Sequence, residues 1–219
     1  MTSDQSATRS KDQERVLVTP TALFHELGSF QGLCCDSLQR YDALFSDAAT
    51  RFLVRGEAEN NADYKQLIPY VIFSYVHEGR RSLFTYCRGS HAGESRLRSK
   101  LSIGVGGHIN ESDSHNAHSG SDLFNACVRR EISEETTITA DILSFRRVAL
   151  VNDDSTPVGR VHLGVICLAE LSAPEMTANE PDLVDARFRP LSELREILLA
   201  HPDAFESWST LALQGIFND

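Results

Sequence analysis

Short apolar runs alternate with polar segments over the middle of the chain, which is the pattern of β-strands separated by turns. Residues 68–76 (IPYVIFSYV) and 82–88 (SLFTYCR) are rich in aromatic and β-branched side chains. The polar segment between them contains a glycine suited to a tight turn, so the two runs predict a β-hairpin. Three further runs have the composition of strands: residues 16–18, 144–151 and 160–170.

Helical periodicity is clearest over residues 122–136, where Leu123, Cys127, Glu131 and Glu135 recur every four positions. Strands grouped around helices without strict alternation indicate an α+β fold with a mixed sheet. Further helices are predicted over residues 37–49, within residues 186–202 after a short strand, and around Trp208, and a polar loop is predicted over residues 57–63.

The composition is that of an ordinary globular protein, with 41% hydrophobic and 24% charged residues among 219. A chain of this length suits one domain with a sizeable extension. No run approaches the roughly 18 apolar residues that a membrane span needs, so a membrane role is not expected. Residues 1–14 are polar and lack an apolar central region, which is typical of a disordered tail rather than a secretory signal and predicts a cytoplasmic protein.

The net charge and the cysteines argue against nucleic-acid binding and against a cysteine-bound zinc ion. A net charge of −10 argues against sequence-independent binding of nucleic acid, which needs a basic face to displace phosphate counterions. The five cysteines include no Cys-x-x-Cys pair for zinc, and we expect all of them to be reduced thiols.

Two carboxylates continue the apolar stripe of the predicted central helix, so Glu131 and Glu135 should face the protein body. With Glu134 beside them, they would repel one another at a cost of several kcal/mol unless a positive charge compensates. Oxygen ligands of this kind suit a hard divalent cation, magnesium or manganese. The alternative is a solvated acidic face that pairs with Arg129 and Arg130.

Residues 106–109 (GGHI), followed by residues 130–138 (REISEETTI), resemble the Nudix box, whose family pattern is G-x5-E-x7-R-E-U-x-E-E-x-G-U, where U is aliphatic. The second half matches at every defined position except Thr137, where the family has glycine. Asp122 stands where the family has glutamate. Because threonine tolerates a positive φ poorly, the end of the helix is expected to differ from that of the family.

A polar insert over residues 110–120 separates the two halves of the box. From Gly107 to Arg130 the chain counts 23 positions, against 14 in the family pattern, so the insert adds nine residues. Its composition offers no core to bury, and we expect a surface loop that can be shortened to the family spacing.

Histidines near this insert could suggest a second metal site, made by His108, His115 and His118. Solvated loop histidines are the simpler interpretation, because no carboxylate or thiolate spacing supports zinc there. His162, in a strand-like run, is interpreted as a satisfied core histidine rather than a catalytic base.

The resemblance spans roughly residues 67–199 and implies a Nudix-type α/β/α sandwich with a central mixed β-sheet. We therefore expect a Nudix-type hydrolase domain over residues 67–219. An N-terminal extension over residues 15–66 would pack on that domain, and residues 1–14 would form the disordered tail.

Carried over residue by residue, the resemblance implies a Mg²⁺ or Mn²⁺ site made by Glu131, Glu134, Glu135 and the backbone carbonyl of Gly106. Glu131 and Glu134 would then also be catalytic. Arg130 would be a structural residue that orients the glutamates by hydrogen bonds.

The resemblance also implies a reaction in which water attacks a diphosphate phosphorus. A general base is expected on a late loop, where Glu180, Asp182 and Asp185 are candidates. The expected function is a magnesium-dependent hydrolase that cleaves a phosphoanhydride bond in a nucleoside diphosphate linked to another group. Its partner would be this small molecule, with no nucleic acid or membrane, and a homodimer is one option for its assembly.

Two other functions remain open from the sequence. The first is a non-catalytic Nudix-like module that senses or binds a nucleotide. The second is an interaction protein whose acidic helix is only a surface.

Overall fold

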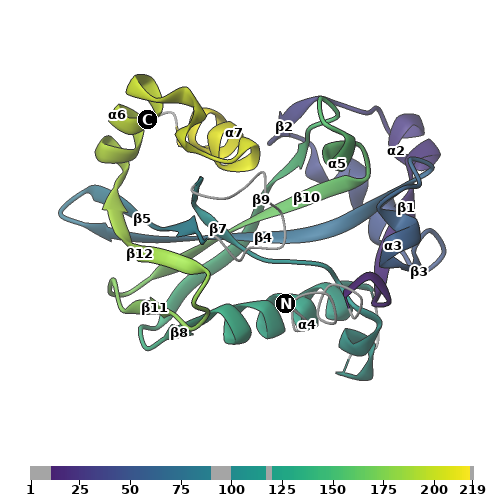
Figure 1. Ribbon diagram of the computed structural model, residues 1–219, viewed down its shortest axis with the longest axis horizontal. Coiled ribbons are helices and arrows are strands. Elements are labelled where there is room, and N and C mark those ends of the chain that lie inside the picture. The colour runs from purple at the N-terminus through teal and green to yellow at the C-terminus, as the bar shows by residue number, and fades with distance from the viewer. Residues whose placement is uncertain (1–10, 90–99, 117–119, 218–219) are drawn as a thin grey trace, which may run out of the picture. The chain divides into compact units, whose positions relative to one another are not determined.

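A computed structural model describes residues 11–89, 100–116 and 120–217 of the chain (Figure 1). Most of the predicted tail, over residues 1–10, and His118 lie outside the described residues. Contacts divide the chain into two compact units. Unit 1 comprises Met1–Pro69, Gly107–Arg130 and Leu150–Val165, and unit 2 comprises Tyr70–Gly106, Glu131–Ala149 and Ile166–Asp219. The domain boundary expected near residue 66 stays a prediction.

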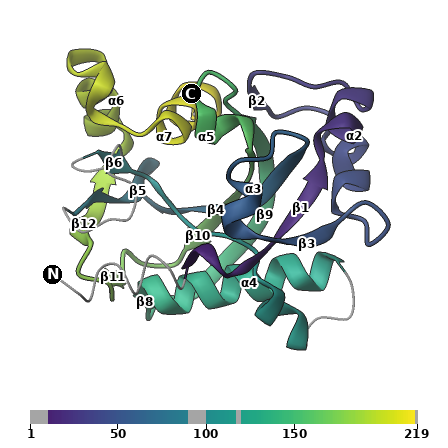
Figure 2. The same cartoon turned by 45° about the vertical axis from the view of Figure 1, so that its right-hand side comes forward.

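The first strand of unit 1 is β1 (Arg15–Pro20), coloured purple in Figure 2. β1 pairs antiparallel with β3 (Arg51–Val54) on one side and with the first residues of β4 (Tyr64–His77) on the other. The short β2 (Gly32–Cys34) pairs with the end of β9 (Ile142–Asn152). The remaining elements of this unit are α2 (Thr21–Glu26), η1 (Leu38–Phe45), α3 (Arg55–Ala58), η3 (Glu111–Asn116) and α5 (Pro157–Arg160), with most of α4 (Gly120–Glu135) and the start of β10 (His162–Leu171).

The core of unit 1 joins segments that are far apart in the sequence. Phe30 packs edge-on against both Phe24 and Tyr41, with ring centroids 5.4 and 5.6 Å away. Leu123 and Cys127 of α4 are buried in the same cluster, so the predicted apolar stripe of this helix faces the core. Burial of these aromatic rings is the main force that orders the segment between β1 and β3.

Unit 2 contains the predicted hairpin. β5 (Arg80–Arg88) pairs antiparallel with the end of β4 and with β12 (Leu183–Pro190). The hairpin turn places Glu78 and Gly79 at φ values of 48° and 73°, the left-handed conformation that two-residue hairpins require. The other elements of the unit are β6 (Leu101–Ser102), β7 (Gly104–Val105), β8 (Thr136–Ile138), β11 (Met176–Ala178), α6 (Leu191–Ala200), η4 (Pro202–Ala204) and α7 (Ser207–Gly215).

Helix α4 ends at Glu135 and strand β8 follows at once, so the helix end does differ from a glycine-terminated one. Thr136 donates a hydrogen bond from its hydroxyl to the carbonyl of Ile132 at 2.7 Å. Thr137 lies in β8 opposite Thr177 of β11, in extended backbone that threonine favours. No positive φ is therefore needed where the family has glycine.

Three predictions for the first third of the chain need correction. The helix expected over residues 37–49 is a 3₁₀ helix, η1, that ends at Phe45. The polar loop expected over residues 57–63 begins inside helix α3, and β4 starts at Tyr64, four residues before the predicted strand. A 3₁₀ turn and a one-turn helix are too short to leave a periodic pattern.

The α+β class is confirmed, since the described chain combines a main sheet with helices that do not alternate strictly with its strands. The five cysteines, all within the described ranges, are free thiols as predicted. In the part of the chain that the structure describes, no helix combines the length and the hydropathy that a membrane crossing needs.

Candidate metal and catalytic site

The C-terminal turns of α4 carry the three glutamates singled out in the sequence. Glu135 is buried, with 8% of its surface exposed, whereas Glu131 is half-buried and Glu134 is exposed. The Oε2 atom of Glu135 is buried without a hydrogen-bond partner in the described structure. A buried carboxylate oxygen with no protein donor is costly, and a proton or a cation would offset that cost.

The charged groups around Glu135 can be identified from their effect on its pKa. The pKa of this carboxyl is raised from its ordinary value of 4.5 to about 8. Burial is the largest cause, the charge of Arg88 opposes the rise, and the negative charges of Glu131, Glu180 and Glu134 contribute to it. Four carboxylates from two segments of unit 2 thus lie close enough to repel one another.

Glu180 reaches this cluster because the loop after β11 is bonded to the end of α4. The backbone N–H of Asn179 donates to the carbonyl of Glu135 at 2.8 Å. The Asn179 side chain accepts from the hydroxyl of Thr137 at 2.7 Å and donates to the carbonyl of Ser133 at 3.3 Å. These bonds place the next residue, Glu180, beside the helix end.

Asp185, another of the three candidate bases, is engaged by two arginines instead. Its carboxylate pairs with the guanidinium of Arg189 and, at 3.2 Å, with that of Arg187. Asp185 has a φ of 54° in the irregular part of β12, which turns its side chain differently from those of a regular strand. Glu180 thus acts on Glu135, whereas the carboxylate of Asp185 is held by Arg187 and Arg189.

Two further features of unit 2 complete this region. Gly106, the expected carbonyl ligand, follows β7 directly and is half-buried. Arg88 ends β5, and its Nε is buried without a hydrogen-bond partner among the described residues. Sequence reasoning missed Arg88, although a cation at the end of a predicted strand next to a glycine was the available signal.

Arg130, expected to orient the glutamates, holds the insert. Its Nε and one terminal nitrogen donate to the two carboxylate oxygens of Asp113 at 2.7 and 3.0 Å. The same terminal nitrogen donates to the carbonyl of His108 at 2.9 Å. Its contact with the glutamates stays a prediction.

The interpretation of residues 110–120 as a surface loop was therefore incomplete. Asp113 is buried on η3 and also accepts from the backbone N–H of Asn110 at 2.8 Å. The composition of the insert hid this contact, because a single buried acid leaves no periodic pattern.

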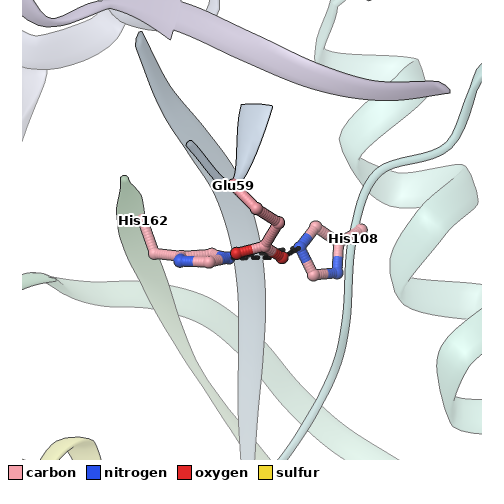
Figure 3. Close-up of side chains that lie close together, drawn as sticks. All are labelled: Glu59, His108 and His162. Atoms are coloured by element: carbon pink, nitrogen blue, oxygen red, sulfur yellow. Dashed lines mark hydrogen bonds and ion pairs between the residues drawn. The ribbon is translucent and has the colours of Figure 1, made fainter. Parts of the chain in front are cut away.

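A second group of potential ligands lies in unit 1 (Figure 3). The Nε2 atoms of His108 and His162 are 3.2 Å apart, and Oε1 of Glu59 is 3.9 Å from each of them. His162 is buried and its Nδ1 bonds to the carbonyl of Val158 at 2.7 Å, so the prediction of a satisfied core histidine is confirmed. His115 is exposed on η3 and bonds to the carbonyl of Ser112 at 2.8 Å, away from this group.

The fold of this chain is also found in solved Nudix structures. The crystal structure of Tm1382, a candidate Nudix hydrolase, superimposes with a TM-score of 0.71 at 26% identity and covers 94% of this chain and 99% of that one. A Nudix hydrolase from Alicyclobacillus acidocaldarius superimposes with a TM-score of 0.52 at 10% identity and covers 69% of this chain and 90% of its own, a likeness of fold alone.

The chain belongs to the Nudix family, and the predicted Nudix-type fold is confirmed. No protein-family model matches it. Protein YmaB of Bacillus subtilis (strain 168) is 31% identical to it over 204 residues, which are 91% of this chain and 95% of YmaB.

Proposed function

We propose that this chain is a magnesium-dependent Nudix hydrolase that cleaves a phosphoanhydride bond in a nucleoside diphosphate linked to another group. The observation that carries the proposal is the convergence of Glu131, Glu134 and Glu180 on the buried Glu135, whose Oε2 lacks a hydrogen-bond partner. A solvated acidic face would leave these carboxylates in water, where their repulsion is weak. A cluster that includes a buried member is instead suited to a divalent cation.

The residues present are compatible with such a cation. Glu131, Glu134, Glu135 and the carbonyl of Gly106 offer only oxygen ligands, which suit Mg²⁺ or Mn²⁺. When bound, the cation would supply positive charge that stabilises the negative charge developing on the diphosphate. That the cation is Mg²⁺ rather than Mn²⁺ is part of the proposal.

The chain's own residues would divide the remaining tasks. Glu180 is exposed and lies near the cluster, so it would accept a proton from the attacking water, and we prefer it to Asp185 as the general base. Arg88 would offset the negative charge that accumulates around Glu135 and the substrate. The interior position of its guanidinium strengthens this effect, because screening by water is weak there.

Hydrolysis of a panel of nucleoside diphosphate derivatives by the purified full chain tests the proposal. With millimolar magnesium, at least one compound should yield two phosphate-containing products, and oxygen-18 water would show which phosphorus is attacked. We expect Glu135→Gln to reduce the rate by about 100-fold or more. Glu196→Gln, which changes an exposed acid on α6, should retain the parent rate.

The remaining outcomes separate the alternatives. Binding of a panel compound without turnover in the parent would support the nucleotide-binding module instead. Turnover at the parent rate in Glu135→Gln would show that the carboxylate cluster is not the active site. Cytoplasmic location and a homodimer remain predictions that accompany this proposal.

A further inference from the structure

We propose that Glu59, His108 and His162 form a second metal site, which binds zinc or a chemically similar transition-metal ion independently of the carboxylate cluster. Figure 3 shows the Glu59 carboxylate pointing toward the two imidazole rings. All three side chains belong to unit 1, whereas the four carboxylates discussed above belong to unit 2. The two sites therefore have different ligands and different chemistry.

The two imidazoles have the spacing of ligands that share one ion. At a Zn–N bond of about 2.05 Å, nitrogens 3.2 Å apart subtend an angle of about 100° at the metal, close to tetrahedral. The ring planes are inclined by 72° to one another, an edge-on arrangement rather than a stacked one.

The tautomer of His162 leaves the required lone pair. A carbonyl oxygen can only accept, so the 2.7 Å bond to Val158 requires the hydrogen to sit on Nδ1 of His162. Nε2 of the neutral ring then carries a lone pair that a metal ion can accept. A metal-ligating histidine that donates its other ring N–H to a backbone carbonyl is the usual arrangement of zinc sites.

Glu59 supplies the third ligand with a small movement. Its Oε1 is 3.9 Å from both imidazole nitrogens and 3.5 Å from Nε of Arg55, one turn earlier. A tetrahedral site with bonds of about 2 Å needs ligand separations of about 3.3 Å, so the carboxylate must approach by about half an ångström. Glu59 follows the last residue of α3, where one side-chain rotation can provide this.

Without a metal, the two rings would share one proton in a hydrogen bond. That arrangement gives Glu59 no direct role, since 3.9 Å is too long for a hydrogen bond. An ion bound by all three would join α3, the segment after Gly107 and the start of β10, which lie far apart in the sequence. Three protein ligands would leave a fourth position for water.

Zinc binding to the full chain, produced without a histidine tag and stripped with a chelator, tests the site. Titration in excess magnesium, which occupies oxygen-ligand sites without competing for imidazole, should give one zinc per chain. Cobalt added in place of zinc should give the intense visible absorption of tetrahedral coordination. Crystals grown with zinc should show an anomalous peak bonded to both Nε2 atoms.

Matched variants decide whether these residues are the ligands. Glu59→Gln and His108→Gln should weaken zinc binding by at least about 10-fold. Glu57→Gln on α3 and His115→Gln on η3 change exposed residues and should bind as the parent does. Since His108→Gln could disturb the fold, Glu59→Gln, with circular dichroism as a check, is the decisive variant.

Two results would overturn the proposal: parent-like zinc binding by Glu59→Gln, or no zinc bound by the parent at micromolar concentration. Zinc binding should persist in Glu135→Gln. Failure of the hydrolase proposal therefore leaves this one intact, and the reverse also holds.

Discussion

Burial and neighbouring negative charges both raise the pKa of Glu135, and the pH dependence of stability measures their effect. Its pKa is raised from 4.5 to about 8 in the metal-free folded chain. The protonated carboxyl therefore favours folding below the unfolded value, and this contribution is lost as the pH rises through the folded value.

We predict that Glu135→Gln is more stable than the parent in chelator, by an amount that grows between about pH 5 and about pH 8 and then levels off. The growth should be roughly 1–3 kcal/mol, less than the full shift implies, because neighbouring carboxylates titrate as well. Urea unfolding at several pH values measures it. Glu196→Gln should show a difference from the parent that does not change with pH, and the same constancy in Glu135→Gln would contradict the assignment.

The buried ion pair of Asp113 with Arg130 could not be predicted from the sequence. We predict that Asp113→Asn lowers the free energy of unfolding by about 2–4 kcal/mol, because it leaves the guanidinium of Arg130 without its buried carboxylate. The matched control is Glu111→Gln on the same η3 helix, whose ion pair with Arg15 is about half exposed on both sides. That change should cost less than about 1 kcal/mol. Equal losses in the two variants would show that the Asp113 pair is not special.

The residue scale shows where sequence reasoning succeeds. Glu135 could be predicted because it continues the stripe of Leu123 and Cys127, and periodicity identifies the buried face of a helix. Asp113, Arg88 and Glu59 could not, because each is a single polar side chain in a segment without periodicity. Their partners are 17 or more positions away or on another element.

Among the elements, the hairpin of β4 and β5 and the strand followed by helix α6 were predicted, because composition and pattern agree there. The region from β2 to α3 was not, because its helices have at most eight residues and its order comes from aromatic packing. A propensity argument has little to act on in such short elements.

The insert and α4 behave as one element through Arg130. The nine-residue deletion that restores the family spacing would remove most of η3, including Asp113. We predict that it destabilises the chain at least as much as Asp113→Asn does, rather than leaving it unchanged. Thermal melting of the deletion variant beside Asp113→Asn measures this, and a parent-like melting temperature would restore the interpretation of a dispensable loop.

Within unit 2, a buried polar network joins the first turn of helix α7 to strand β4. The hydroxyl of Tyr70 donates to Oε1 of Glu206 at 2.6 Å and is 2.7 Å from that of Ser209. We predict that Tyr70→Phe costs about 1–3 kcal/mol, because two buried polar groups lose a partner. Tyr75→Phe, on the same strand but half-buried, should cost less than about 0.5 kcal/mol. Urea unfolding of both variants compares them, and similar losses would show that the network contributes nothing specific.

At the scale of the whole molecule, both the family and the fold class could be predicted, since one helix with its box motif and the preceding glycines carried the resemblance. The division into two units of interleaved segments could not, because it depends on contacts between residues distant in sequence. The box motif itself crosses this division: residue 130 belongs to unit 1, and residues 131–135 belong to unit 2.

Magnesium should couple to the stability of the whole chain if the carboxylates converge on one cation. The folded chain would then bind magnesium far better than the unfolded chain, in which the carboxylates are scattered. At a magnesium concentration about ten times the dissociation constant, linkage adds about 1.4 kcal/mol. For a chain of this size that raises the melting temperature by about 3 to 6 °C.

Comparing magnesium with sodium, in the parent and in two variants, separates metal binding from charge screening. Sodium at matched ionic strength only screens the repulsion between carboxylates and should raise the melting temperature less than magnesium does. Glu131→Gln removes one ligand charge, so its magnesium shift should fall to the size of its sodium shift, while Glu196→Gln keeps the parent response. Melting curves in magnesium, sodium and chelator measure all three proteins without knowledge of the substrate. Identical shifts for the two cations in the parent would mean that Glu131, Glu134 and Glu135 form only an acidic surface.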